Sequence, residues 1–276
     1  MAAGKVSVLN LTVLLGYAVA ALALFVSLRF DRETSSPLTP ASVGALLGLG
    51  AAILHARALY AAVLRPEGWL LNVPNVLSLF AWQLGLLAVI AAASRELRVV
   101  SLPLFVIAAA GALLTGRGTE AFARAEPALE LKIHALLSLL AFGLLAAAAV
   151  VAVFLLFQDR RLRHGHVSGW LGTLPPLFVT ERLLFSILAG GWGLLTLSLA
   201  SGFLFIDNMF DQHLAHKTVL SLLGWVILSV LLVGHRLRGW RGRRTVHWVL
   251  GSFALLIVAY FGSKAILEDV LGRTWG

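Results

Sequence analysis

Three histidines lie within or at the edge of long apolar runs of the chain: His55, His134 and His235. An ionisable side chain in a membrane helix costs about 3 kcal/mol at the bilayer centre, so its presence needs an explanation. The neutral imidazole ring can bind haem iron or a transition metal without a counter-charge, and a hydrogen bond at its second nitrogen fixes its orientation. Alternatively, each ring packs between helices and hydrogen-bonds to a carbonyl or a hydroxyl. From the residues alone, both interpretations stay open.

The positions of the three histidines along their runs restrict which of them can share a metal. His55 lies near the middle of its run, His134 near the start of another and His235 near the end of a third. With a rise of 1.5 Å per residue, His134 and His235 are separated by roughly 30 Å of membrane depth, too far to bind one iron together. If two histidines share an iron, His55 is therefore one of them, and His134 is the favoured partner.

Other polar and aromatic side chains in the runs have two interpretations each. Arg57 follows His55 by two residues and either extends to the membrane interface or meets an anion, such as a haem propionate or the Glu130 carboxylate. Trp82, Trp192 and Trp225 lie deeper than the other tryptophans and either line a slot for a porphyrin or are ordinary packing between helices.

No arrangement for catalysis is present in the sequence. Cysteine is absent, which excludes disulfides, thiolate metal sites and covalent haem attachment. The chain has no HExxH, GxSxG or phosphate-binding loop, and no paired carboxylates inside an apolar run. We therefore predict no catalytic residue and a protein that is not an enzyme.

The composition predicts a membrane protein. Of the 276 residues 59% are hydrophobic and only 13% are charged, a balance that a soluble domain of this size could not sustain. Apolar runs long enough to cross a hydrocarbon core of about 30 Å recur along the chain. We predict an all-α polytopic membrane protein of a single transmembrane domain (1–276) with about eight spans, at 6–29, 41–63, 73–93, 99–115, 130–157, 183–206, 217–236 and 246–270.

The distribution of charge predicts the orientation of these spans. The net charge is +9, and the arginines concentrate in the odd-numbered links, of which the seventh contains Arg236, Arg238, Arg241, Arg243 and Arg244. The positive-inside rule places these links in the cytoplasm, so both termini are expected outside. The arginines then face anionic lipid headgroups, which makes the bilayer and not nucleic acid the expected partner.

Four segments resemble, in order and spacing, the core of the CcsA/CcmC/HemX superfamily of cytochrome c assembly proteins. They are PALELKIHALLSLLAFGLL (127–145), LPPLFVTERLLFSILAGGWGLLTLSLASG (174–202), HKTVLSLLGWVILSVLLVGHRLRGWRGRR (216–244) and AYFGSK (259–264). The string GWRGRR after a span that ends in histidine is the most specific part. On this resemblance the core of the family covers about 127–270.

The resemblance implies a bacterial inner-membrane protein that handles haem. It matches His235 to an in-membrane histidine of the family, His134 to an outer histidine and His55 to a histidine of the early spans, with non-covalent haem b as the cofactor. Proteins of cytochrome c assembly or of haem biosynthesis are the implied partners. The tryptophan-rich outer loop of the family is replaced by FLFIDNMFDQHLAHK, which makes the chain more similar to the HemX branch, where haem is bound or its supply regulated.

The hypothesis from the sequence is therefore a haem-binding membrane protein with His55, His134 and His235 as candidate ligands of haem iron and Arg57 as a candidate partner of a propionate. A small-solute permease is one alternative, and it predicts helices that are broken at mid-membrane. A structural accessory or scaffold subunit, in which the histidines fill space, is the other.

Overall fold

A computed structural model of the chain describes residues 7–30, 39–65, 68–118, 128–163, 175–205 and 215–262. These residues form eight α-helices, and the all-α prediction is confirmed. The helices are α1 (Val8–Phe30), α2 (Pro40–Val63), α3 (Val73–Ala93), α4 (Arg98–Ala112), α5 (Leu129–Arg163), α6 (Leu177–Phe205), α7 (Ala215–Arg238) and α8 (Arg243–Ile257). The last continues as a π-helical segment, η2 (Val258–Gly262), and a two-residue ladder pairs β1 (Leu64–Arg65) with β2 (Gly68–Trp69).

Capping residues and prolines in the sequence mark the starts of α2 and α3. Thr39 accepts a hydrogen bond from the Ser42 amide at the start of α2, and Asn72 accepts one from the Asn75 amide at the start of α3. A proline stands in the first turn of each, where its missing N–H costs nothing. These caps fix where the chain leaves the links and enters the apolar helices.

Among the described helices, six are long and apolar enough to cross a membrane: α1, α2, α3, α5, α6 and α7. The chain is therefore a polytopic membrane protein. The fifteen residues of α4 span only about 22 Å, less than a typical hydrocarbon core. The α-helical part of α8 is equally short. The number of eight spans stays a prediction.

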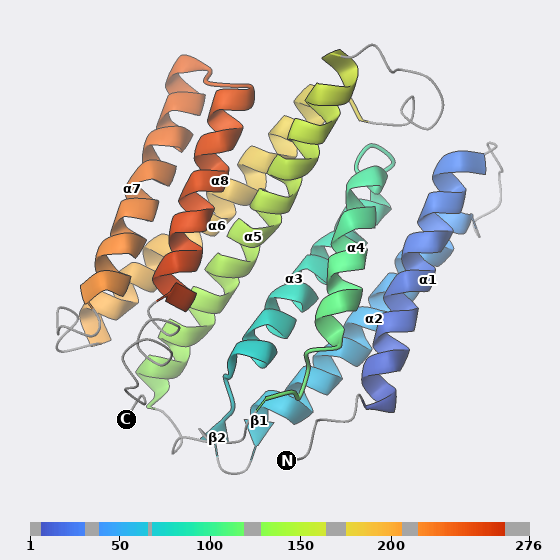
Figure 1. Cartoon of the computed structure of the whole chain (residues 1–276), viewed down its shortest axis with the longest axis horizontal. Helices are drawn as coiled ribbons and strands as arrows, with labels where there is room; N and C mark the ends of the chain where they lie inside the picture. The colour runs from blue at the N-terminus through green and yellow to red at the C-terminus, as the bar shows by residue number, and fades with distance from the viewer. Residues whose placement is uncertain are drawn as a thin grey trace.

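The helices form two groups of four (Figure 1). In the first, α1 contacts α2 and α4, and α3 contacts the same two helices. In the second, α5 and α7 each contact α6 and α8, and α5 also packs on α3 and α4. One continuous cluster of buried apolar side chains extends through both groups.

The α3–α4 turn (94–97) and the α7–α8 turn (239–242) lie at the same end of the molecule, and the β1–β2 ladder lies at the other (Figure 1). The arginines of these two links therefore share one end, as the alternation of charge along the sequence predicts. That this end faces the cytoplasm stays a prediction.

Small residues allow the helices of the first group to approach closely. A methyl group on Gly111 of α4 would collide with the Cβ of Ala81 on α3, and one on Gly48 of α2 would collide with the Phe105 ring of α4. Because lipid provides no hydrophobic force between helices, such close packing is a main source of their association.

The two groups are joined where α3 meets α5. The Gln83 Nε2 atom donates a hydrogen bond of 3.1 Å to the Leu139 carbonyl, and the Gln83 side chain lies against Gly143. The Phe80 and Phe142 rings stack with 4.6 Å between their centroids. This contact holds the second group, with two of the three candidate histidines, in a fixed position against the first.

The Gly111–Ala81 contact gives a test of the packing. We expect Gly111→Ala to lower the free energy of unfolding by about 1–3 kcal/mol, because the added methyl group forces α3 and α4 apart. The measurement is the thermal unfolding midpoint of the purified protein in mild detergent. Gly193→Ala on α6 is the matched control, since a methyl group there meets nothing within 4 Å. Equal midpoints for the two variants would contradict the close approach.

Candidate functional site

His55 is completely enclosed in the first helix group, and both of its ring nitrogens face hydroxyls. Its Nε2 atom lies 2.9 Å from Ser78 Oγ on α3, and Ser78 Oγ in turn lies 2.6 Å from Thr115 Oγ1 after α4. Its Nδ1 atom lies 3.5 Å from the Tyr17 hydroxyl on α1. The exposed fraction of the His55 side chain is 0%. With a hydroxyl on each nitrogen, the ring ties α1, α2 and α3 together, and through Ser78 also the segment after α4, and it presents no free lone pair to a metal.

Arg57 lies on the opposite face of α2 from His55, because two helical residues turn the chain by about 200°. Its side chain is exposed, and among the described residues no carboxylate lies within ion-pair distance of it. The structure therefore has Arg57 extending outward and away from the environment of His55.

His134 lies in the second turn of α5 and is half-buried against α6. Its Nδ1 atom lies 3.1 Å from the Ser198 carbonyl and 3.0 Å from Ser201 Oγ. A carbonyl only accepts hydrogen bonds, so Nδ1 carries the proton and Nε2 carries the lone pair. No described residue hydrogen-bonds to that Nε2 atom.

His235 lies in the last turn of α7 and is also half-buried. Its Nδ1 atom donates a hydrogen bond of 2.8 Å to the Trp240 carbonyl, which again leaves the lone pair on Nε2. The ring stacks on Phe185 of α6, with 3.5 Å between centroids and 8° between planes. One face of the imidazole is therefore covered, while no described residue hydrogen-bonds to Nε2.

The turn after α7 explains why His235 is held in this way. Gly239 has a φ of 63°, a left-handed conformation that glycine adopts without strain, and α7 ends there. The reversal brings the Trp240 ring against Gly234, where any Cβ would collide with the indole. The Trp240 carbonyl then faces His235. The glycines and the tryptophan of GHRLRGW are thus the residues that orient the histidine.

An aromatic seam, defined by Phe185, Trp192 and Thr196 of α6 and Trp225 and Ser229 of α7, extends from His235 into the membrane. The Trp192 Nε1 atom donates to Ser229 Oγ and the Trp225 Nε1 atom donates to Thr196 Oγ1, both at 2.8 Å. The two indole rings are stacked with 6.0 Å between centroids and 17° between planes. On α6, Trp192 follows Phe185 by seven residues and Thr196 follows Trp192 by four, a spacing that places the three side chains on one helix face.

Trp82 is different from the two tryptophans of the seam. Its Nε1 atom donates to the Ala52 carbonyl at 2.9 Å, so it packs α3 on α2 within the first group. Of the three deep tryptophans, Trp192 and Trp225 belong to the α6–α7 seam that begins at Phe185, the ring on which His235 stacks. The sequence did not distinguish them, although the spacing of seven between Phe185 and Trp192 is a signal that could have done so.

The structure does not bring the three histidines together. His134 contacts α6 at Ser198 and His235 contacts it at Phe185, thirteen residues earlier, or about 20 Å along the helix. These two contacts lie on different faces of α6, whereas His55 is surrounded by the first helix group. The described residues contain no cluster of three or more histidine, aspartate or glutamate side chains that could hold a metal.

Comparison with known proteins gives a consistent result. The model of the family described as cytochrome c assembly protein matches residues 70–271. The inner membrane protein YpjD of Escherichia coli K12 is 32% identical over 224 residues, which make up 79% of this chain and 84% of YpjD. An uncharacterized 28.8 kDa protein from the nifR3-like 5' region of Azospirillum brasilense is 30% identical over 148 residues, 53% of this chain and 55% of that protein. No solved structure matches the chain significantly.

These matches confirm the resemblance that the sequence motifs indicated. Together with the six apolar helices, they identify a multi-pass protein of the bacterial inner membrane.

The environment of His55 gives a prediction about its role. We expect His55→Ala to lower the free energy of unfolding by about 2–4 kcal/mol, because it leaves a cavity and removes a hydrogen-bond partner from the Tyr17 and Ser78 hydroxyls. Arg57→Ala, which removes an exposed side chain from the same helix, is expected to change it by less than about 0.5 kcal/mol. Thermal unfolding in detergent measures both. An unchanged unfolding midpoint in His55→Ala would show that the ring is not a structural tie.

Proposed function

The chain belongs to the cytochrome c assembly protein family, and on that premise we propose that it binds haem b non-covalently within the membrane and handles or senses haem, without catalysing a reaction. His235 is the residue that would bind the haem iron on this geometry. The observation that carries this proposal is the hydrogen bond from His235 Nδ1 to the Trp240 carbonyl, which fixes the ring and leaves Nε2 available as a ligand.

Aromatic and basic side chains on α6 and α7 are of the types that could hold a haem group near His235. Phe185 stacks on the His235 ring, and Trp192 and Trp225 provide further flat apolar surfaces about two to three helical turns away. Arg236 and Arg238 are exposed in the last turn of α7 and are suited to propionates. With 6.0 Å between the two indole centroids, the seam is filled by its own side chains, so haem entry requires the indoles to separate.

Bound haem would supply an iron centre, and the Trp240 carbonyl and the Phe185 ring would orient the imidazole that binds it. His134 offers a second free Nε2 atom, but its place on another face of α6 makes it a separate candidate and not the second ligand of the same iron. We therefore infer one protein imidazole for each iron. His55 and Arg57 have no part in this proposal, because the first lacks a free nitrogen and the second faces outward.

The missing tryptophan-rich outer loop supports a role in haem handling or sensing, as in the HemX branch, over presentation of haem to an apocytochrome. Residues 206–214, where that loop would stand, lie outside the described part of the chain. Proteins of cytochrome c assembly or of haem biosynthesis are the proposed partners. The described residues around His235 contain no pair placed for acid-base or nucleophilic work, which is the support for a role other than catalysis.

An accessory subunit that binds no haem is the second candidate function. The observation that favours it is His55, whose ring is satisfied entirely by neighbouring hydroxyls. A permease has less support, because α1–α3 and α5–α7 are each continuous along their described lengths, and Pro103 of α4 is the internal proline.

Haem titration of the purified protein tests the choice of ligand. We expect wild type to develop a Soret band of single-histidine character, and His235→Ala to lose at least about 90% of it, because the axial nitrogen is removed. Added imidazole is expected to restore part of the band in that variant. His247→Ala is the matched control, since His247 is an exposed histidine near the same end, with its Nδ1 atom 2.6 Å from the Arg243 carbonyl.

Two results would contradict this assignment. One is a His235→Ala protein that binds haem as wild type does. The other is a bis-imidazole spectrum in wild type that is lost on replacing His55, since this would require the first helix group to open.

A further inference from the structure

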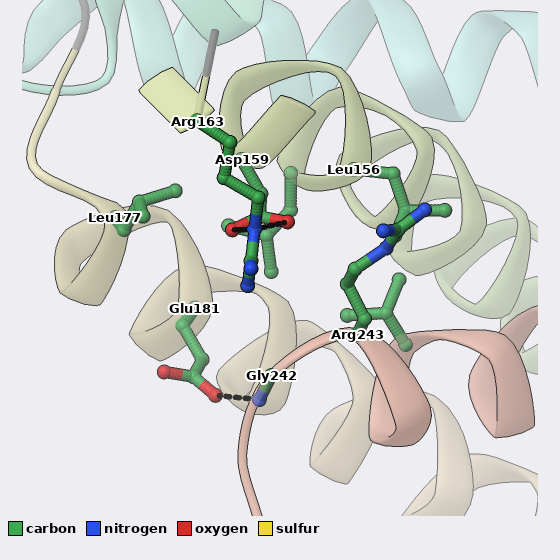
Figure 2. Close-up of a pocket in the computed structure, with 9 residues that line it drawn as sticks. Leu156, Asp159, Arg163, Leu177, Glu181, Gly242 and Arg243 are labelled. Atoms are coloured by element: carbon green, nitrogen blue, oxygen red, sulfur yellow. Dashed lines mark hydrogen bonds and ion pairs between the residues drawn. The ribbon is translucent and has the colours of Figure 1, made fainter. Parts of the chain in front are cut away.

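A small cavity of about 100 Å³ lies at the arginine-rich end of the second helix group, between α5, α6 and α8 (Figure 2). Its apolar lining comes from Leu155, Leu156, Leu177 and Val246, and its polar lining from Asp159, Arg163, Glu181, Gly242 and Arg243. The volume equals that of about three liquid waters and is well below the 300 Å³ or more of a site for a drug-sized molecule. The cavity therefore suits a headgroup and not a macrocycle.

The acidic side chains in the lining are already engaged. Arg163 Nε lies 3.1 Å and 3.0 Å from the two carboxylate oxygens of Asp159. Glu181 Oε1 accepts a hydrogen bond of 3.3 Å from the Gly242 amide, at the start of α8. In Figure 2 the Arg243 guanidinium extends toward Leu156 on α5, away from Glu181. Among the described residues no carboxylate lies within ion-pair distance of Arg243.

Further arginines near the cavity in the sequence are exposed: Arg161 in the last turn of α5, Arg182 in the second turn of α6, and Arg241 and Arg244 on either side of Gly242 and Arg243. Within the lining, the carboxylates of Asp159 and Glu181 balance the charges of Arg163 and Arg243. The excess of positive charge at this end therefore comes from the exposed arginines. An anion is the ligand that this arrangement favours.

The apolar part of the cavity determines which anion fits. Four aliphatic side chains form its inner wall, and Phe178 of α6 is 65% exposed on the outer surface of the same end. Trp248 of α8, an interfacial type of residue, is 54% exposed. A phosphate group beside guanidinium groups with acyl chains along an apolar wall is the arrangement found where basic pockets between membrane helices bind anionic lipids.

We propose that this cavity binds the phosphate group of an anionic phospholipid, with Arg243 as its main contact. The site is separate from the aromatic seam, and the proposal does not depend on haem binding. Since a free phosphate ion offers the same chemistry, the source of the phosphate is part of the test.

The experiment is a lipid titration of the full-length protein in mild detergent, followed by native mass spectrometry. We expect dioleoylphosphatidylglycerol to be retained and dioleoylphosphatidylcholine, which has the same chains and no net charge, to be retained at least about tenfold more weakly. Arg243→Gln is expected to weaken phosphatidylglycerol retention about tenfold. Arg29→Gln, which changes an exposed arginine in the last turn of α1 outside the cavity, is expected to weaken it less than twofold.

Glu181→Gln is a second variant, and we expect it to strengthen lipid binding. A misfolded protein could not produce such a gain. The amide oxygen of glutamine can still accept from the Gly242 amide, while removal of the negative charge is expected to tighten phosphatidylglycerol binding. Equal effects of Arg243→Gln and Arg29→Gln, or equal retention of the two lipids, would overturn the proposal. Displacement of phosphatidylglycerol by millimolar inorganic phosphate would also overturn it, since the ligand would then be a soluble anion.

Discussion

In the hydrocarbon core no water is available to pair with a buried polar group, so each polar side chain of these helices has to find its partner within the protein. The first helix group satisfies this requirement around His55, where the Tyr17 and Ser78 hydroxyls meet the two ring nitrogens and Thr115 pairs with Ser78. Further along, the Asn10 Nδ2 atom donates to the Thr115 carbonyl and the Asn75 Oδ1 atom accepts from the Gly116 amide. These contacts join α1, α3 and the segment after α4 at one end, and they make the group a rigid support.

The second group satisfies the same requirement only in part. The two indole N–H groups of the seam are paired across α6 and α7, but the Nε2 atoms of His134 and His235 have no partner among the described residues. Both histidines lie near the ends of their helices, where an unpaired nitrogen is less costly than at the bilayer centre. His55 in the first group therefore has a structural role, whereas His134 and His235 in the second group each have a nitrogen available for a ligand.

Much of the fold could be predicted from the sequence because hydrophobic length and charge are local properties. The apolar runs mark the helices to within several residues, and α5 and α6 extend beyond their runs because charged and polar residues such as Arg163 and Glu181 continue the helix at the interface. The short α4 was expected to reach Thr115, but its chain leaves the α-helix at Leu113 and turns toward Gly116, which has a φ of 74°.

The site could be predicted only in its residue types. Whether a histidine is satisfied depends on side chains from other helices, and the hydroxyls that surround His55 come from residues 17, 78 and 115. The sequence of the run that contains His55 does not indicate which side chains of other helices lie beside it. By contrast, the local string that includes Gly234, Gly239 and Trp240 contains the whole explanation of how His235 is oriented. Sequence reasoning identified that string by resemblance, and the structure supplies its physical reason.

The turn between α7 and α8 links the two sites on this end of the molecule. The Trp240 carbonyl orients His235, and two residues later the Gly242 amide, with a φ of 84°, is held by Glu181 of the cavity wall. Glu181 also stands one turn before Phe185, the ring on which His235 stacks. A displacement of this turn would therefore change the orientation of the imidazole and the shape of the cavity together. Because both contacts pass through a turn of four residues (239–242) with two glycines of positive φ, this turn is the part of the second group on which the position of His235 depends most directly.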